Sequence, residues 1–329
     1  MADGRRRTLL ALAGASLAPA AGGSRTARAQ DWPSRPVRFI VPFPPGGAND
    51  VLARLLGVQL STALGQQVVI DNRGGANTII GCDLTAKATP DGYTILIVPG
   101  SHAINPSLYR ALPYDTVKDF AAVSLVGNGA YVLLANPSLP ARSIEELLAL
   151  ARAKPGTLSY ASAGIGNITH LAGELFASMG GVRFTHVPYK GGGQALADLV
   201  GGHVSLYFAT VAAAGPHLKS GKLRALAVTT TKRTAALPTV PTMAEAGLPG
   251  YEVSGWYGVL APARTPRPVV DRLSRAISKA VQVPEVRDTL VNVLGIDPVG
   301  SEPALLDARI REEIPRWGKL VRSLGIQPE

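Results

Sequence analysis

One local order recurs four times along this chain and constrains its fold more than any other feature. An apolar strand is followed by a turn containing glycine and then by a helix with an apolar face. The order occurs in residues 37–65, 66–88, 156–180 and 183–202. Alternation of this kind predicts an α/β protein with largely parallel sheets joined by right-handed crossovers.

The first of these units carries the clearest turn. Residues 37–41 (VRFIV) are mostly β-branched or aromatic, and the apolar stripe of the following helix closes at Gly65. Between them stands FPPGG, residues 43–47. Such a turn leaves backbone N–H groups unpaired at the positive end of the helix dipole, where an anion can bind. The alternative is a short connection that binds nothing, since glycine also serves tight turns.

Capping residues and apolar runs predict the remaining elements. Asn167 suits the start of one helix, and Asn77 or Thr78 the start of another. Capping boxes begin helices at Ser143 with Glu146 and at Thr242 with Glu245. Further helices run from Thr265-Pro266 through Val281 and over residues 301–324, where Pro315 perturbs the helix. Short strands are expected at 94–98, 131–135, 204–208, 224–228 and 254–262.

The first 29 residues read as an export signal. Three arginines (5–7) precede an apolar stretch from 8 to 21, and Ala27-Arg28-Ala29 fits a small-x-small cleavage pattern. We therefore expect cleavage near Ala29 and a periplasmic protein; Arg6-Arg7 leaves a twin-arginine signal open as the alternative. Residues 1–29 hold five arginines and one aspartate, so the net charge of the remainder falls from +10 to +6.

Charge, size and cysteine content exclude several classes of protein. The remaining cations are dispersed, without the basic helix and interleaved aromatics of a nucleic-acid surface. A mild positive excess favours anionic small molecules. Some 300 residues after the leader exceed what one core usually holds, so we expect two lobes, with strands crossing between them near 125–130 and 250–256. Cys82 is the only cysteine and is expected to be a buried apolar residue rather than a nucleophile.

The usual catalytic patterns are missing. None of the five histidines (102, 170, 186, 203, 217) has the i, i+4 partner or the nearby cysteine of common zinc sites. His170 begins a helix beside a glycine loop and is either a structural or a pocket-lining residue. ASAGIG lacks the first glycine of a nucleophile elbow, GIGNIT is half of a dinucleotide fingerprint, and YKGGGQ lacks the lysine of a phosphate loop. These features favour a binding protein with no metal, no cofactor and no catalytic residues.

Six ordered blocks of sequence resemble one known family. They include RPVRFIVPFPPGGANDVLARLL, DNRGGANTIIGCDLTAKATPDGYTIL, SYASAGIGNITHLAGELF and HVPYKGGGQALADLVGGHV. The resemblance is to the tripartite tricarboxylate transporter receptors, the TctC-like or Bug-type extracytoplasmic solute-binding proteins, and it extends from about Trp32 to the last helix. It implies a two-lobed periplasmic binding protein of type II (Venus flytrap), with a mainly parallel sheet in each lobe and strands crossing between lobes. The expected division is a leader over 1–29, lobe 1 over 30–127 plus 254–329, and lobe 2 over 128–253.

The resemblance also implies a binding site between the lobes. Two turns would offer main-chain N–H groups, and in lobe 2 a serine hydroxyl, to a carboxylate. The expected residues are Phe43, Gly46, Gly47, Asn49 and Asp50 in lobe 1, and Ser162, Ala163, Gly164, Gly166 and Asn167 in lobe 2. Asn49 and Ile165 depart from residues that the family often has. Asp50 either stabilises the first turn of its helix or orders water and disfavours a second anion.

The function implied is capture of a small organic carboxylate by a monomeric receptor that delivers it to a tripartite tricarboxylate-type membrane transporter. Two alternatives stay open. A sensory or orphan binding subunit that signals to a membrane kinase would share this fold. An α/β oxidoreductase using GIGNIT would need an acidic residue about 20 positions further on, where the sequence has FTHVPYKGG.

Overall fold

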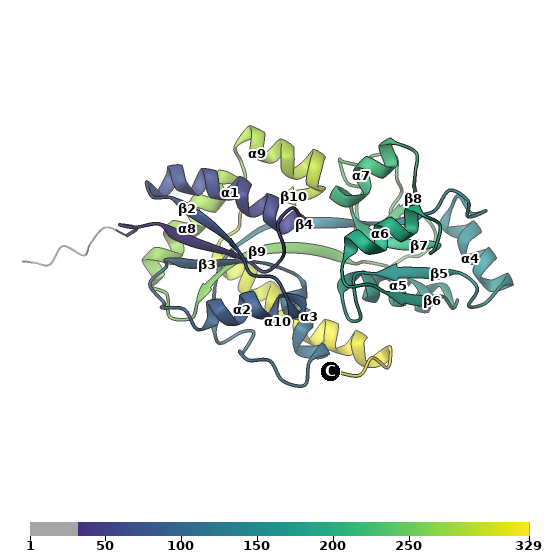
Figure 1. Cartoon of the computed structure of the whole chain (residues 1–329), viewed down its shortest axis with the longest axis horizontal. Coiled ribbons are helices and arrows are strands. Elements are labelled where there is room, and N and C mark those ends of the chain that lie inside the picture. Colours follow the sequence, from purple (N-terminus) through teal and green to yellow (C-terminus); the bar gives the residue numbers. More distant parts are fainter. Residues whose placement is uncertain (1–31, 329) are drawn as a thin grey trace, which may run out of the picture. The chain divides into compact units, whose positions relative to one another are not determined.

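The computed structural model describes residues 32–328 (Figure 1). The leader predicted over residues 1–29 lies outside the described residues. The architecture below belongs to the compact unit that begins at Pro33. Among the described residues, no helix combines the length and the apolar character that a membrane span requires.

Strands and helices alternate along most of this unit. The strands are β1 (Val37–Val41), β2 (Val68–Asn72), β3 (Thr94–Pro99), β4 (Phe120–Ala135), β5 (Ser159–Ser162), β6 (Thr185–Pro188), β7 (Leu206–Thr210), β8 (Arg224–Val228), β9 (Ser254–Pro262) and β10 (Ile296–Pro298). The helices are α1 (Ala48–Leu64), η1 (Ala76–Thr78), α2 (Ile79–Ala86), α3 (Ser101–Leu108), α4 (Ile144–Ala153), α5 (Ile168–Gly180), α6 (Gly192–Val200), α7 (Val211–Lys219), α8 (Arg267–Ala280), α9 (Pro284–Asp288), η2 (Thr289–Leu294) and α10 (Pro303–Ser323).

The sheet has two parts that share the long strand β4. Its order is β2-β1-β3-β9-β4-β7-β5-β6, and β8 and β10 also pair with β4. We call β1, β2, β3, β9 and the first half of β4, with the helices packed on them, the first lobe; β5 to β8 and the second half of β4 form the second. In Figure 1, β4 and β9 run through the junction between them. The fold is a two-lobed α/β fold in which antiparallel strands accompany the parallel β2-β1-β3 and β6-β5-β7 sets.

The register places the carboxyl ends of both parallel sets at the junction. β9 enters the first lobe at Ser254, opposite Ala130, and its Tyr257 pairs with Pro99, the last residue of β3. In the second lobe, Thr210 at the end of β7 pairs with Tyr131, where β4 enters that lobe. Since parallel neighbours end at the same edge, the turns that follow β1, β2 and β3 face the junction, and so do those after β5, β6 and β7.

Most predicted elements are present, and one predicted helix is absent. The strand at 37–41 and the helix that ends at Gly65 are β1 and α1, and Ser143 and Asn167 cap α4 and α5. Thr242 and Glu245 form both hydrogen bonds of a capping box, at 3.1 and 2.8 Å, yet only a turn follows, so the predicted helix there is wrong. Thr78 precedes α2 without a side-chain capping bond, and φ is positive at all three residues of η1.

Contacts between the lobes occur beside two glycines. A Cβ atom added to Gly166, in the turn before α5, would lie 2.5 Å from Leu108 at the end of α3. One added to Gly295, after η2, would lie 2.5 Å from Cβ of Val211 at the start of α7. Only glycine permits these approaches, so the lobes pack closely at both points.

Candidate functional site

The turn between β1 and α1 leaves the start of a 17-residue helix uncapped. Residues 44–47 are exposed, and the N-cap residue Gly47 provides no side-chain hydrogen bond. Within the described part of the chain, the amide N–H groups of residues 47–50 have no hydrogen-bond partner. The turn predicted from the sequence therefore presents four donors at the positive end of α1, on the edge that faces the junction.

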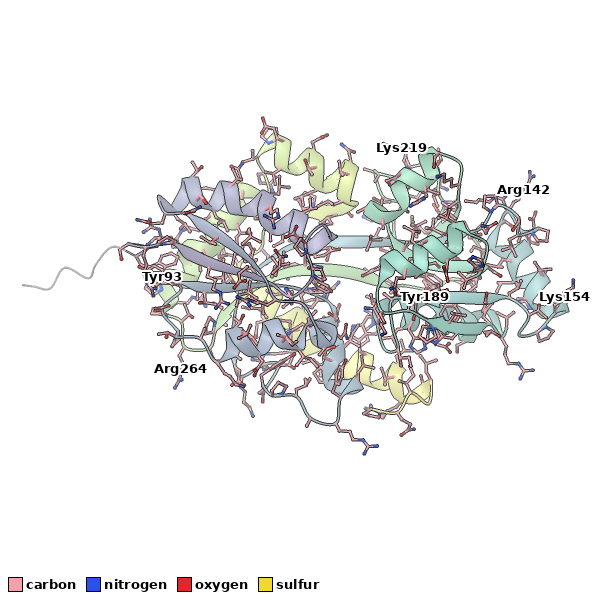
Figure 2. The ribbon with its side chains drawn as sticks, in the orientation of Figure 1. Tyr93, Arg142, Lys154, Tyr189, Lys219 and Arg264 are labelled. Atoms are coloured by element: carbon pink, nitrogen blue, oxygen red, sulfur yellow. The ribbon has the colours of Figure 1, made fainter. Side chains whose placement is uncertain are left out.

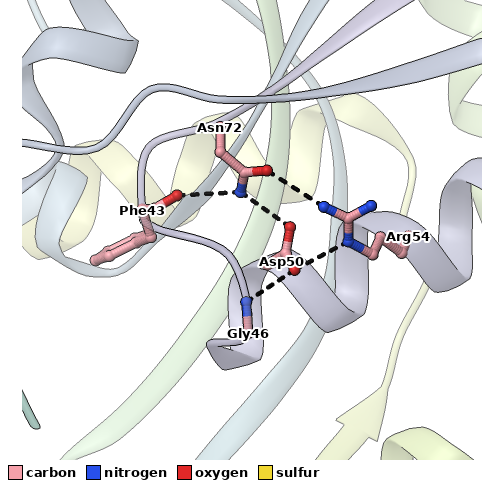
Figure 3. Close-up of polar contacts among 5 residues, drawn as sticks. All are labelled: Phe43, Gly46, Asp50, Arg54 and Asn72. Atoms are coloured by element: carbon pink, nitrogen blue, oxygen red, sulfur yellow. Dashed lines mark hydrogen bonds and ion pairs between the residues drawn. The ribbon is translucent and has the colours of Figure 1, made fainter. Parts of the chain in front are cut away.

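Asp50 holds this turn in place (Figure 3). Its Oδ2 accepts from the amide of Gly46 at 3.0 Å and from Nε of Arg54 at 2.9 Å, while Oδ1 accepts from Nδ2 of Asn72 at 2.9 Å. The same Asn72 amide donates to the carbonyl oxygen of Phe43 at 3.1 Å. Asp50 thus connects the turn to α1 and to the end of β2, which supports the structural alternative for this residue.

The surroundings of Asp50 stabilise its charged form. Burial would raise the pKa of this carboxyl, but hydrogen bonds from Arg54, Gly46 and Asn72 outweigh burial and lower it to about 2. The charge is therefore present at every physiological pH and is occupied by its own donors. Beside it, the buried side-chain oxygen of Asn49 has no hydrogen-bond partner among the described residues.

The turn between β5 and α5 is bonded mostly to itself. The amide of Ala163 donates to Oγ1 of Thr169 at 2.8 Å, and that of Gly164 to Oγ of Ser162 at 3.2 Å. The amide of Gly166 donates to Nδ1 of His170, and the amide of Asn167 donates to the carbonyl oxygen of Gly164. In the described residues of this turn, the amide of the exposed Ile165 is left without a partner.

Two stacked histidines, His170 and His186, hydrogen-bond to residues of this turn. The rings of His170 and His186 have centroids 4.1 Å apart, and Nε2 of His186 lies 2.7 Å from Oγ of Ser162. Burial lowers the pKa of both imidazoles to about 4, and the proximity of His170 adds to the effect on His186. Both rings are therefore neutral at pH 7. The sequence left His170 as either a structural or a pocket-lining residue. In the structure it is buried and its Nδ1 accepts from the amide of Gly166, which favours the structural role.

The ten predicted site residues form two groups, one in each turn. Four side chains that hold these turns in place were missed by sequence reasoning: Arg54, Asn72, Thr169 and His186. Arg54 lies four residues after Asp50, a helical spacing that could have indicated the ion pair. Asn72 and His186 reach the turns from neighbouring strands, so only the strand register reveals them. Contact of the ten residues with a ligand stays a prediction.

Cys82 has a histidine neighbour that the sequence did not reveal. Its Sγ lies 3.7 Å from Nδ1 of His102, and both side chains are fully buried. Burial raises the pKa of the thiol to about 12 and lowers that of the imidazole to about 4, so both groups are neutral. A thiolate nucleophile is not available here. Residues 32–328 contain no group of three or more His, Cys, Asp or Glu side chains that could hold a metal ion.

Two surface hollows lie away from both turns. One, of about 270 Å³, is lined by residues of α4 and the turn after α5. The other, of about 330 Å³, is lined by residues at and after the end of α2, by residues after β9, and by Lys118 and Asp119. Neither contains one of the ten predicted residues, so the case for the site depends on the free donors at the turns.

Comparison with known proteins finds one family and several solved structures with the same fold. Residues 52–326 match the model of the tripartite tricarboxylate transporter family receptor. The chain is 39% identical to Rpa4515 of R. palustris, solved with adipate, with a TM-score of 0.85 over 91% of this chain and all of that one. It is 35% identical to the periplasmic binding protein BugD, with a TM-score of 0.82 over 91% of this chain and all of that one. It is also 35% identical to MatC from Rhodopseudomonas palustris, solved with malate, with a TM-score of 0.79 over 88% of this chain and all of that one.

Proposed function

Because the chain belongs to the tripartite tricarboxylate transporter receptor family, we propose that it is a periplasmic, non-enzymatic receptor for a small organic carboxylate. The ligand binds at the junction of the lobes, and the loaded receptor delivers it to a membrane transporter of the tripartite tricarboxylate type. The leader over residues 1–29 supports export. The ligands solved with two relatives, adipate and malate, are both carboxylates.

One observation carries the proposal: the four unpaired amide N–H groups of residues 47–50 at the start of α1. A helix dipole alone contributes about 0.3–1 kcal/mol, whereas a micromolar complex requires about 8 kcal/mol. Three or four hydrogen bonds to a charged group, at about 1.5–3 kcal/mol each, supply a binding free energy of this size before the entropic cost of association is subtracted. The free amides are therefore the main source of affinity for a carboxylate.

Asp50 supports this function without touching the ligand. Its hydrogen bond to Gly46 fixes the turn so that the following amides point outward, and its charge is matched by Arg54. A carboxylate whose oxygens are filled in this way repels a bound anion less than a free one would. The unpartnered side-chain oxygen of Asn49 accepts from a ligand hydroxyl or an ordered water.

Loading closes the lobes on the ligand, since the two facing edges must approach for one molecule to bind both. In this state the turn before α5 contributes the hydroxyl of Ser162 and the amide of Ile165.

The alternative of a subunit that signals to a membrane kinase uses the same site and differs only in the partner.

A thermal-shift screen tests the function. The purified mature protein is heated with millimolar adipate, malate, citrate, succinate and benzoate, and with glucose, putrescine and NAD as neutral, cationic and nucleotide controls. A ligand that binds the folded state raises Tm in proportion to RT ln(1 + [L]/Kd). We expect a shift of several degrees with at least one carboxylate. Shifts confined to the controls would contradict the proposal, and a shift with NAD would favour the oxidoreductase alternative.

A further inference from the structure

The turn before α5 is held by one histidine at each of its ends. Nε2 of His186 lies 2.7 Å from Oγ of Ser162, and Nδ1 of His170 accepts from the amide of Gly166 at 3.0 Å. Between these two contacts the turn carries the exposed Ile165, whose amide has no partner in the described part of the chain. The position of that free amide therefore depends on both imidazoles.

This turn lies at the junction of the lobes. The amide of Tyr189 donates to the carbonyl oxygen of Ser162 at 3.0 Å, and Figure 2 shows Tyr189 at the side of the second lobe nearest the first. A Cβ atom added to Gly166 would lie 2.5 Å from Leu108 of the first lobe. Gly166 thus packs against the first lobe and is hydrogen-bonded to His170, so a change at that imidazole reaches the junction.

The hydrogen bond from Gly166 requires one protonation state of His170. Nδ1 accepts this bond only while it carries no proton, which assigns the proton of the neutral ring to Nε2. A second proton, on Nδ1, would place two N–H groups against each other and break the bond. The ring of His186 is stacked on that of His170 with centroids 4.1 Å apart, so a charge on one imidazole disfavours a charge on the other.

Within the described residues, the titratable groups that face the pair are Glu174 on α5 and Tyr160 on β5. Oε1 of Glu174 lies 3.9 Å from Nε2 of His170 and accepts from the hydroxyl of Tyr160, whose ring stacks on both imidazoles. Burial lowers the pKa of both histidines to about 4, although Glu174 acts to raise that of His186. His170 therefore keeps its acceptor at neutral pH and loses it as the pH falls through about 4.

We infer that His170 is a positioning residue for the ligand: its unprotonated Nδ1 holds the amide of Gly166 and so keeps the free amide of Ile165 in place for a carboxylate. A proton on His170 releases the turn and weakens binding in acid. The turn of the first lobe keeps its form in this range, because the pKa of Asp50 is about 2. This inference rests on the proposed function and adds to it a residue outside the ten predicted ones.

Two variants separate the hydrogen-bond acceptor from the imidazole ring. In His170→Asn the side-chain oxygen takes the place of Nδ1 but does not titrate, whereas His170→Leu has no acceptor. Calorimetry measures Kd at pH 7 for whichever of adipate, malate, citrate, succinate and benzoate gives the largest thermal shift. We expect His170→Leu to weaken binding about tenfold, as for loss of one hydrogen bond to a charged group, and His170→Asn to stay within about twofold of wild type. The exposed His203→Leu is the control and should bind as wild type does.

A second measurement repeats the comparison at pH 3.5. The ratio of the Kd of wild type to that of His170→Asn removes the titration of the acid itself, since both proteins meet the same ionised fraction. With a pKa of about 4, about a quarter of His170 is unprotonated at pH 3.5, so this ratio should rise about fourfold above its value at pH 7. Thermal unfolding without ligand verifies that each protein is folded at each pH.

Three results would overturn the positioning role while carboxylate binding stands. They are wild-type affinity in His170→Leu at pH 7, equal weakening in His170→Asn and His170→Leu, and a Kd ratio that does not change between pH 7 and pH 3.5. If His170→Leu does not fold, the pH comparison of wild type with His170→Asn decides alone. Failure of wild type to bind any of the five acids would instead overturn the proposed function, and the inference with it.

Discussion

The hydroxyl oxygen of Ser162 lies 2.7 Å from Nε2 of His186, a residue 24 positions further along the chain. Ser162 has a single proton, which it can donate to His186 or to the carbonyl oxygen of Gly164 at 3.1 Å. The imidazole therefore decides whether the serine proton is free for a ligand. His186 stacks on Tyr160 and on His170, so its ring is held by packing as well as by this bond.

The histidine pair makes stability depend on pH. Both pKa values fall from 6.5 to about 4 on folding, so the fold favours the neutral rings. This contribution is fully present above pH 6.5 and is lost as the pH falls to 4, because the unfolded chain binds the protons first. We expect the free energy of unfolding to drop by about 2–3 kcal/mol per histidine over this window.

His186→Gln checks this directly. Urea unfolding of the variant at pH 7 and at pH 4 should show a drop about half that of wild type, since one titrating ring is gone. The exposed His203→Gln is the control and should keep the full drop. An undiminished drop in His186→Gln would mean that other groups cause the acid sensitivity.

Asp50→Asn should destabilise the first lobe. The carboxyl has its pKa lowered from 3.8 to about 2 by Arg54, Gly46 and Asn72, against the effect of burial. Such a shift corresponds to about 2 kcal/mol of folding free energy, present above pH 3.8 and lost as the pH falls through 2. Urea unfolding at pH 7 should show this loss in the variant, whereas Asp307→Asn, in the exposed pair with Arg311, should change stability by less than about 0.5 kcal/mol. Equal losses of stability in Asp50→Asn and Asp307→Asn would contradict the prediction that the hydrogen bonds of Asp50 stabilise the fold more than an exposed ion pair does.

Glu313 on α10 accepts hydrogen bonds from two indoles, one on β9 and one on α10 itself. Its Oε2 accepts from Nε1 of Trp256 at 2.7 Å and from Nε1 of Trp317 at 3.1 Å, and Oε1 pairs with Arg309 at 2.8 Å. Glu313→Ala leaves two indole donors and a guanidinium without their shared partner. We expect a loss of about 3–5 kcal/mol in the free energy of unfolding, measured by tryptophan fluorescence in urea. The control is Glu312→Ala, one residue earlier on the exposed side of α10; a similar loss there would show that the effect is not specific to the indole contacts.

Local patterns predicted most elements, and the failures have tertiary causes. The sequence predicts a strand over 131–135 and a crossing strand near 125–130, but not that both belong to one strand, β4, which begins at Phe120 and includes Gly127 and Gly129. In the structure these residues stay in the strand opposite β9, where Gly129 and Gly255 leave room for the rings of Tyr257 and Tyr131. A glycine that accommodates a ring across the sheet looks the same in sequence as one that turns the chain.

The site was only partly predictable for a related reason. The glycine turn before α1 and its free amides follow from residues adjacent in sequence. Whether the turn before α5 keeps its amides free depends on Thr169, which accepts from Ala163, and on His170, which accepts from Gly166. Those bonds depend on side-chain orientation, which spacing alone does not fix.

The amide of Ala48 offers the sharpest test of the proposed binding mode. It is the first residue of α1, where its N–H bonds nothing in the described structure, and Gly47 before it has φ −81° and ψ 170°. Proline suits this helix position and accepts a preceding residue of that conformation. Ala48→Pro therefore removes one free donor without removing a helical hydrogen bond.

We expect Ala48→Pro to keep or slightly raise Tm without ligand and to weaken the carboxylate found in the screen by about tenfold or more, the value of one charged hydrogen bond. Ala48→Gly retains the N–H group and should bind within about twofold of wild type, although it lowers helix propensity. Calorimetry on the three proteins separates donor loss from changes in the helix. Should Ala48→Pro bind as tightly as wild type while Ala48→Gly weakens, the affinity would depend on the stability of α1 and not on its free amides.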